Sequence, residues 1–206
     1  MGERGAAREP DEDWSELARV GAGDGAAFEP LVARYQDRLV GLCQRFLGDR
    51  EEALDAAQEV LLKVYRNASR AQPRGRFFTW VYRIAVNHCL NRLRRRRLVR
   101  FLSLSLGEER DEGPRFEPAS PAADPEAELA ARERWRRTRR ALDALPESQR
   151  AVVVLARFEG LSQKEIAATL GITEGAVESR LVRALRRLET AQEAVPPRVA
   201  PGRAEG

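Results

Sequence analysis

One stretch near the C-terminal end constrains the fold more than any other: residues 162–188, SQKEIAATLGITEGAVESRLVRALRRL. Ser162 and Glu165 have the spacing of a capping box, which predicts that a helix begins there. Gly171 is placed to end that helix in a left-handed cap, and Thr173 can cap a second helix. Two helices joined by a short turn that contains a glycine are the helix-turn-helix pattern.

The second helix of this pattern has two different faces. Its apolar stripe consists of Val177, Leu181, Leu185 and Leu188. The opposite face is mostly polar and basic: Glu174, Gly175, Glu178, Ser179, Val182, Arg183 and Arg186. In helix-turn-helix proteins, the first residues of the second helix contact base edges and later basic residues contact phosphates. This favours DNA binding, and the alternative is a helical hairpin with a solvated charged face.

Composition narrows the class of protein. The chain has 206 residues, of which 33% are charged and 43% hydrophobic, and its isoelectric point is about 9.6. It has no apolar run long enough to span a membrane, and its first thirteen residues are too polar for a secretory signal, so a cytoplasmic protein is expected. Cys43, His88 and Cys89 are too few for a structural zinc site. We expect buried thiols, no metal and no cofactor.

Taken from its first residue, the chain shows patterns of apolar residues that predict an all-α fold of two small helical domains. Residues 1–13 are expected to be a disordered leader, followed by a short helix over 14–20. Apolar residues then recur at helical spacing up to Phe46: Phe28, Leu31, Val32, Tyr35, Leu39, Leu42 and Phe46. Asp49 and Glu52 predict a second capping box. The helix after it has this core face: Leu54, Ala57, Leu61, Val64, Tyr65 and Ala68.

A long helix predicted over 77–97 lies within a segment of unusual charge. From Val60 to Gly107 there is no Asp or Glu but there are twelve Lys or Arg residues, which repel one another unless a polyanion neutralises them. Aromatic residues interleaved with arginine suit single-stranded nucleic acid, because bases stack on rings. The alternative is that the aromatics are core and the arginines merely solvated. A core position is favoured for Phe77 and left open for Trp80 and Tyr82, and nucleic acid is favoured as the partner of the arginines.

The composition changes at residues 98–127, where the later part of the stretch is acidic and contains several prolines. This composition predicts a flexible linker between the two domains. The second domain is predicted over 128–190. Its first helix has the apolar residues Leu129, Trp135, Leu142 and Leu145, and its second has Val152, Val153, Leu155 and Phe158. Residues 191–206 are expected to be a disordered tail.

Three segments together resemble the sigma-70 family of bacterial sigma factors, in its extracytoplasmic-function (ECF) group. They are DAAQEVLLKVYRN (55–67), FFTWVYRIAVNHCLNRLRRRR (77–97) and the segment 144–188 that contains the helix-turn-helix. The resemblance implies a first domain (14–97) that reads and melts the promoter −10 element and a second that reads the −35 element. It also implies core RNA polymerase as partner, through the beta-prime clamp for the first domain and the beta flap for the second. An anti-sigma factor is usual in the family.

The same resemblance implies roles for individual residues. The helix face that docks on the polymerase clamp would be Asp55, Gln58, Glu59 and Leu62. The −10 reading and melting site would be Asn67, Arg76, Trp80, Tyr82, Arg83, Asn87 and Arg92. The −35 reading face would be Thr173, Glu174, Glu178, Ser179, Arg180, Val182, Arg183 and Arg186.

One residue departs from the family pattern. Glu178 stands where many relatives have a basic residue, and since a carboxylate can accept from cytosine N4, we expect it to read a base. Two rival functions follow from the residues alone. A stand-alone helix-turn-helix regulator explains 126–190 but not the acid-free segment or the linker. An enzyme acting on nucleic acid needs a nucleophile, paired carboxylates or a metal cluster, for which the sequence offers no candidate.

Overall fold

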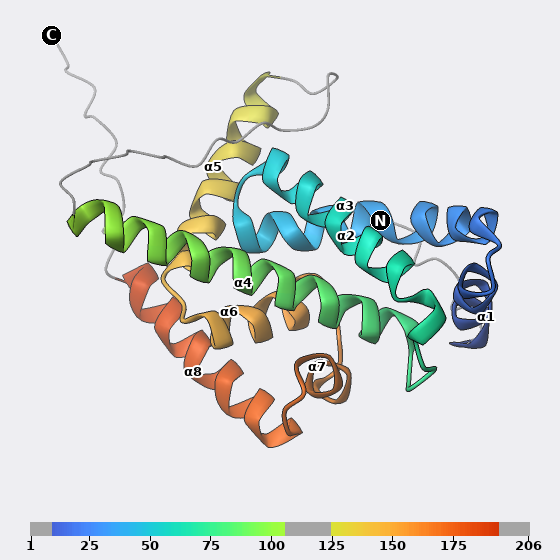
Figure 1. Ribbon diagram of the computed structural model, residues 1–206. Helices are drawn as coiled ribbons and strands as arrows, with labels where there is room; N and C mark the ends of the chain where they lie inside the picture. The colour runs from blue at the N-terminus through green and yellow to red at the C-terminus, as the bar shows by residue number, and fades with distance from the viewer. Residues whose placement is uncertain (1–9, 106–124, 194–206) are drawn as a thin grey trace, which may run out of the picture.

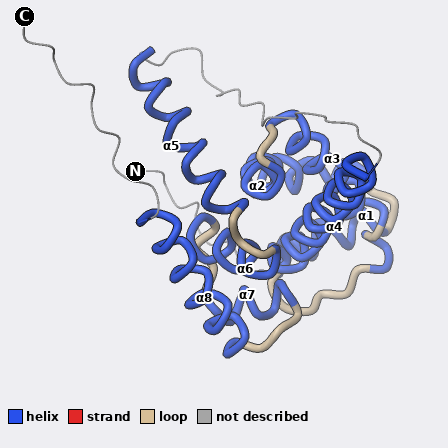
Figure 2. Tube along the Cα trace, turned by 90° about the vertical axis from the view of Figure 1, so that its left-hand side faces the viewer, coloured by secondary structure: helices blue, strands red, loops and turns tan. Residues whose placement is uncertain are grey.

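The computed structural model describes residues 10–105 and 125–193, and these residues form only helices, turns and loops (Figures 1 and 2). The N-terminal half, residues 10–105, contains α1 (Pro10–Gly21), η1 (Gly25–Phe28), α2 (Glu29–Leu47), α3 (Arg50–Arg66), η2 (Ala68–Arg70) and α4 (Phe77–Ser105). The C-terminal half, residues 125–193, contains α5 (Pro125–Asp143), α6 (Glu147–Val153), η3 (Val154–Phe158), α7 (Gln163–Leu170) and α8 (Glu174–Glu193). The all-α prediction is confirmed.

The core of the N-terminal half lies where α2, α3 and α4 pack against one another. Apolar residues at three- and four-residue steps face this core, as the pattern predicts for amphipathic helices. Its largest fully buried side chains include Leu39, Leu42, Phe46, Val60, Val64, Val81 and Val86. Gly48 ends α2 in the left-handed conformation with φ 82°, which is a conformation that favours glycine. None of the described helices is long and apolar enough to cross a membrane.

The start of the chain differs from its prediction. Residues 10–13, expected to belong to a disordered leader, are the first turn of α1, and residues 1–9 lie outside the described ones. The Asp13 carboxylate accepts from the Tyr35 hydroxyl at 2.6 Å and pairs with Arg34 on α2. Trp14 is buried, and its indole N–H donates to the Gly75 carbonyl at 2.9 Å. α1 is therefore held across the loop that follows η2.

The predicted capping box at the start of α3 is only half formed. The Asp49 side chain accepts from the backbone N–H of Glu52 at 2.9 Å. The Glu52 carboxylate does not return to Asp49, because it pairs with Arg96 on α4. α4 itself extends to Ser105, eight residues beyond the predicted end at Arg97, so the first part of the expected linker is helical. Of the rest, residues 106–124 lie outside the described ones, and residues 125–127 belong to the first turn of α5. Residues 191–193 of the predicted tail end α8, and residues 194–206 lie outside the described ones.

The C-terminal half is built on contacts of α8 with α6 and α7. The helix predicted after Pro146 begins at Glu147, as expected, but its last turn, Val154–Phe158, widens into a π-helix. There the Glu159 N–H donates to the Val154 carbonyl at 3.3 Å, five residues back. Val154 and Leu155 are fully buried within this turn.

Three residues assigned to the core by their spacing are exposed. Tyr65 is 44% exposed and lies edge-on to Phe28, with ring centroids 5.2 Å apart. Leu129, on the first turns of α5, is 58% exposed. Phe158 is 38% exposed and lies under the Arg45 guanidinium at 5.0 Å. Helical spacing identified the correct face in each helix, but the neighbouring element does not cover the end of that face.

The two halves pack against each other along α4, which crosses the molecule with α2 and α3 on one side and α6, α7 and α8 on the other (Figure 1). We call this contact the seam. At one end of it, Arg139 on α5 and Arg150 on α6 both donate to the Phe46 carbonyl, at 2.9 and 3.3 Å. Arginines at the C-terminus of α2 satisfy a carbonyl that the helix leaves free and complement its dipole. The sequence predicted two linked domains but not that they dock.

Candidate nucleic-acid interface

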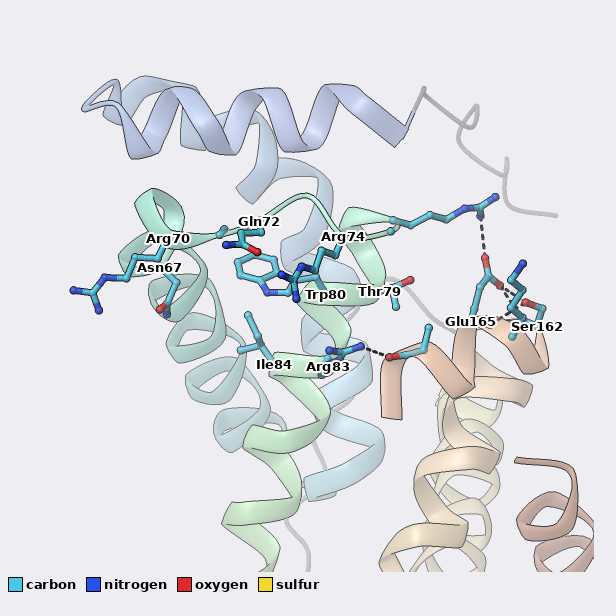
Figure 3. A pocket seen from close by; sticks show the side chains of 15 residues that line it. Asn67, Arg70, Gln72, Arg74, Thr79, Trp80, Arg83, Ile84, Ser162 and Glu165 are labelled. Atoms are coloured by element: carbon cyan, nitrogen blue, oxygen red, sulfur yellow. Dashed lines mark hydrogen bonds and ion pairs between the residues drawn. The ribbon is translucent and has the colours of Figure 1, made fainter. Parts of the chain in front are cut away.

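A cavity of about 980 Å³ opens between the loop after α3, the first turns of α4 and the start of α7 (Figure 3). Its lining is strongly basic, with one large aromatic ring. The residues are Asn67, Arg70, Ala71, Gln72, Arg74, Gly75, Arg76, Thr79, Trp80, Arg83, Ile84, Ser162, Lys164, Glu165 and Ala168. Guanidinium groups around an indole suit a nucleotide, whose phosphate and base they can bind separately.

Four of the residues predicted to read the −10 element meet at this cavity: Asn67, Arg76, Trp80 and Arg83. Trp80 is half-buried and packs at 5.4 Å from the Trp14 ring, so its position is fixed by α1. The Asn67 amide donates to the Lys63 carbonyl at 2.7 Å, which orients it at the end of α3. Asn87 is exposed two turns further along α4 and does not line the cavity.

Tyr82 and Arg92 lie elsewhere. The sequence left undecided whether Tyr82 packs in the core or stacks on a base. In the structure its side chain is only 2% exposed, and its hydroxyl donates to a Glu159 carboxylate oxygen at 2.9 Å. Burial and the Glu159 charge raise the pKa of the Tyr82 hydroxyl well above its usual range. Arg92 is half-buried and directs its guanidinium to the Glu52 carbonyl. In this arrangement of the halves, neither side chain can reach a base in the cavity.

The cavity also contains residues that were not assigned individually from the sequence. Arg70 and Arg74 belong to the acid-free segment, but nothing in their spacing distinguished them from its other arginines. Thr79 is a buried polar residue on the first turn of α4. Lys164 and Glu165 come from α7, across the seam, and only the packing of the two halves brings them here.

The helix-turn-helix forms as predicted. Ser162 and Glu165 make the full capping box, and Gly171 is left-handed with φ 66°. The Thr173 hydroxyl accepts from the Ala176 N–H at 3.2 Å, which caps α8. Burial raises the pKa of Glu165, but hydrogen bonds from Ser162 and the charge of Arg76 outweigh it and hold that pKa below its usual value.

The predicted −35 face of α8 points to solvent. Its exposed members are Thr173, Glu174, Glu178, Ser179, Val182, Arg183 and Arg186, and Arg180 is half-buried. Arg183 donates to the Ser179 hydroxyl at 2.7 Å, so these two side chains are already oriented together. A helix with acidic and small residues first and arginines later can enter a major groove and meet phosphates.

The predicted polymerase-docking residues form one stripe on α3. Asp55, Gln58 and Glu59 are exposed, and Leu62 is 49% exposed beside them. Their spacing of three, one and three residues places all four on one face of the helix. An exposed apolar side chain beside carboxylates and an amide, on a surface turned away from the core, is suited to a protein partner.

The cysteines and the histidine lie inside the N-terminal half. Cys43 on α2 and Cys89 on α4 are both fully buried free thiols. The neighbouring Cys43 thiol and burial raise the pKa of Cys89, which keeps it protonated. Burial and the Lys63 charge lower the pKa of His88, whose Nδ1 lies 2.6 Å from the Lys63 ammonium. Among the described residues, no three metal-ligating side chains gather at one place.

Comparison with known families gives two matches that together span most of both halves. The profile described as Sigma-70 region 2 matches residues 31–99, and the one described as Sigma-70, region 4 matches residues 135–188. Trp80 and Arg83 lie within the first match, and α7 and α8 lie almost wholly within the second.

Individual relatives are similar over nearly the whole chain. The RNA polymerase sigma-H factor of Pseudomonas aeruginosa is 33% identical over 181 residues, covering 88% of this chain and 94% of that protein. The ECF RNA polymerase sigma factor SigE of Mycolicibacterium smegmatis is 36% identical over 204 residues, covering 89% of this chain and 76% of that protein.

Among solved structures, that of CnrH in complex with the cytosolic domain of CnrY superposes with a TM-score of 0.65 at 26% identity, covering 89% of this chain and 99% of that one. A structure of the sigma factor RpoE in complex with the anti-sigma factor NepR, from Bartonella quintana, superposes with a TM-score of 0.60 at 22% identity. The match covers 81% of this chain and 96% of that one, and it shows that the fold is shared.

Proposed function

The chain belongs to the extracytoplasmic-function group of the sigma-70 family, and from this premise we propose how its two halves divide the work of starting transcription. As a sigma factor it binds core RNA polymerase and directs it to promoters. In the proposed division, the N-terminal half docks on the polymerase and holds the unpaired −10 strand. The C-terminal half reads the −35 duplex.

Docking on the beta-prime clamp is assigned to the exposed stripe on α3. Leu62 supplies apolar area at the C-terminal end of the stripe, and Asp55, Gln58 and Glu59 supply hydrogen-bonding groups on the turns before it. Protein interfaces combine apolar area and polar groups in this way. The C-terminal half would contact the beta flap. An anti-sigma factor, of the kind present in the RpoE complex described above, is proposed as a competing partner.

Capture of the −10 strand is assigned to the basic cavity. Taking a base out of the stack costs a few kcal/mol, so the site that receives it must return that energy by stacking and ion pairing. Trp80 offers a ring held in place by Trp14, and Asn67 can hydrogen-bond to a base edge. Arg70, Arg74, Arg76 and Arg83 can neutralise the strand phosphates. Strand opening is thereby stabilised without any bond being made or broken.

The −35 element is assigned to α8, with Glu178 and Ser179 at base edges and Arg183 and Arg186 at phosphates. One observation carries the whole proposal: a single chain combines a basic cavity of about 980 Å³ that contains an aromatic ring with a helix whose basic face is exposed. A stand-alone duplex-binding regulator would use α8 but has no need of the cavity or of the stripe on α3.

The test is run-off transcription from a genomic promoter library, with core RNA polymerase alone and with the protein added. We expect transcripts that depend on the protein and begin at a fixed distance from a shared two-part motif. Absence of such transcripts, together with tight duplex binding by the protein alone, would instead establish the stand-alone regulator.

A further inference from the structure

Helix α1 contacts both ends of the loop beside the cavity, residues 67–76, which we call the capture loop. At the end of this loop, the Trp14 indole N–H donates to the Gly75 carbonyl at 2.9 Å. At its start, α1 lies so close to η2 that a Cβ added at Gly21 would be 2.9 Å from Cα of Ser69. In Figure 3, α1 is the pale blue helix that runs past the loop at the top. A single helix therefore spans the loop from its first residues to its last.

Both contacts restrict a backbone that could otherwise move. Glycine at position 21 lets α1 approach the backbone of η2 closely, because any other residue would place a Cβ there. Gly75 has φ 77°, and glycine leaves this left-handed conformation at little cost. The hydrogen bond from Trp14 comes from outside the loop and favours one position of the Gly75 carbonyl.

Trp14 also contacts the aromatic side of the cavity. It is 7% exposed, and its ring lies 5.1 Å from the Phe77 ring, edge-on, and 5.4 Å from the Trp80 ring. The rings of Phe77 and Trp80 are 5.8 Å apart, so the three rings form one cluster. Of the three, Trp80 alone lines the cavity. Trp14 therefore contacts both the ring that is offered to a base and the loop beside it.

The position of α1 is fixed in turn by α2. The Asp13 carboxylate accepts from the Tyr35 hydroxyl at 2.6 Å and pairs with Arg34, which also pairs with Glu16 at 3.1 Å. Leu17, one turn beyond Asp13, is buried in the core. All of these contacts lie within the N-terminal half, so they do not depend on where the C-terminal half is placed.

We infer that α1 is a brace for base capture, an inference that rests on the proposed function of the cavity. Trp14 and Gly21 are its positioning residues, and they act on a flipped base of the −10 strand through the capture loop and Trp80. Neither residue lines the cavity, and α1 precedes residues 31–99, which match Sigma-70 region 2. A loop that already has its bound shape binds more tightly, because less conformational freedom is lost when the base enters.

The experiment measures capture of a base separately from binding of phosphates. The probes are fluorescein-labelled single strands that carry the −10 motif found by run-off transcription, one complete and the others with an abasic site at one position of the motif. Anisotropy gives the dissociation constant of each probe for core polymerase loaded with the full-length protein. The ratio of the abasic to the complete probe, at the position where it is largest, reports capture of the base.

Two variants should lower this ratio. Trp14→Phe keeps an aromatic ring but removes the N–H that holds Gly75, and we expect a ratio about threefold to tenfold smaller, which is the effect of one hydrogen bond on an equilibrium constant. Gly21→Ala should act in the same direction, because its Cβ displaces η2. Binding of the abasic probe should stay unaltered in both variants, because the arginines of the cavity are still present.

Two matched substitutions serve as controls. Tyr35→Phe removes one hydroxyl that holds α1 to α2, and Gly25→Ala adds a Cβ at an ordinary 3.6 Å from the Tyr65 hydroxyl. Both should keep the wild-type ratio. A loss of stability alone reduces the amount of folded protein and weakens binding of every probe equally, so it leaves the ratio unchanged. Circular dichroism checks folding, and Gly21→Ala provides the test if Trp14→Phe does not fold.

The outcomes separate the brace from the function on which it rests. Wild-type ratios in both Trp14→Phe and Gly21→Ala would overturn the brace alone, provided that the wild-type protein itself distinguishes the probes. An equal fall in Tyr35→Phe and Gly25→Ala would also overturn it, since any weakening of the N-terminal half would then suffice. A wild-type protein that initiates transcription but binds all probes alike rejects base capture, and one that directs no initiation rejects the proposed function.

Discussion

Replacing Gly48 by alanine should destabilise the protein more than the same change at a matched glycine. Gly48 and Gly171 both end helices in the left-handed conformation, and each donates its N–H to a carbonyl four residues back. They differ in their surroundings: an added Cβ at Gly48 would lie 2.4 Å from Cζ of Arg139, whereas at Gly171 it would meet no atom within 4 Å.

The magnitude follows from these two geometries. An alanine in the left-handed region costs about 1–2 kcal/mol at either position. At Gly48 the Arg139 guanidinium must also move, and it is nearly buried and donates to the Phe46 carbonyl at 2.9 Å and to Asp143 at 2.7 Å. A hydrogen bond from a charged group is worth about 1.5–3 kcal/mol. We therefore expect a loss of about 2.5–5 kcal/mol for Gly48→Ala and about 1–2 kcal/mol for Gly171→Ala.

Urea denaturation followed by circular dichroism gives both free energies of unfolding under the same conditions. The comparison cancels the backbone cost that both variants share, and leaves the cost of displacing Arg139. Equal losses in the two variants would refute the reasoning, because they would mean that the contact of α5 with the end of α2 contributes nothing to stability.

Three further predictions concern single side chains. Leu62→Asp, at an exposed position on α3, should change the free energy of unfolding by no more than about 0.5 kcal/mol. It should weaken binding to core polymerase by about tenfold or more, as measured in a pull-down titration. An unaltered affinity would show that Leu62 is not part of the docking surface. The pKa of Glu165 in the folded state lies below its usual value of 4.5. The ionised carboxylate therefore stabilises the fold fully above pH 4.5, and this stabilisation is lost as the pH falls through the lower, folded-state pKa. Glu165→Gln should therefore flatten the acid side of a stability–pH curve, and an unchanged slope would contradict the pairing with Ser162 and Arg76. Glu178→Ala should remove about 1–3 kcal/mol of discrimination at one base pair of the −35 element, and binding to a set of promoter variants with unaltered preference would show that Glu178 reads no base.

Local features of the fold could be predicted from the sequence because their partners are near in the chain. The capping box of Ser162 and Glu165 and the glycine cap at Gly171 each involve residues within four positions. The apolar stripes of α2 and α8 need only helical periodicity. The end of α4 was placed too early, at Arg97, because the arginine-rich stretch stops there and the sequence changes character; yet no glycine or proline follows before Gly107, and the helix continues to Ser105.

Features that depend on the docking of the halves could not be predicted. Tyr82 resembles its aromatic neighbours in sequence, but its hydroxyl partner, Glu159, lies 77 positions away. Glu52 was assigned to a capping box, which is a local contact, but the distant Arg96 competes successfully for its carboxylate. Both cases have one physical cause: a charged or hydroxyl group is satisfied by the nearest partner in space, and sequence spacing reports only the nearest partner along the chain.

The π-helical turn at Val154–Phe158 makes the length of this segment as important as its composition. Such a turn contains one residue more than a turn of regular α-helix, because its hydrogen bonds join residues five positions apart. Removing one residue here would restore regular winding and rotate every following residue by about 100° relative to α6. Glu159 would then no longer face its ion-pair partner Arg45, and α7 and α8 would start from a different direction. Deleting one codon from this turn would therefore re-aim α8, the helix proposed to read DNA.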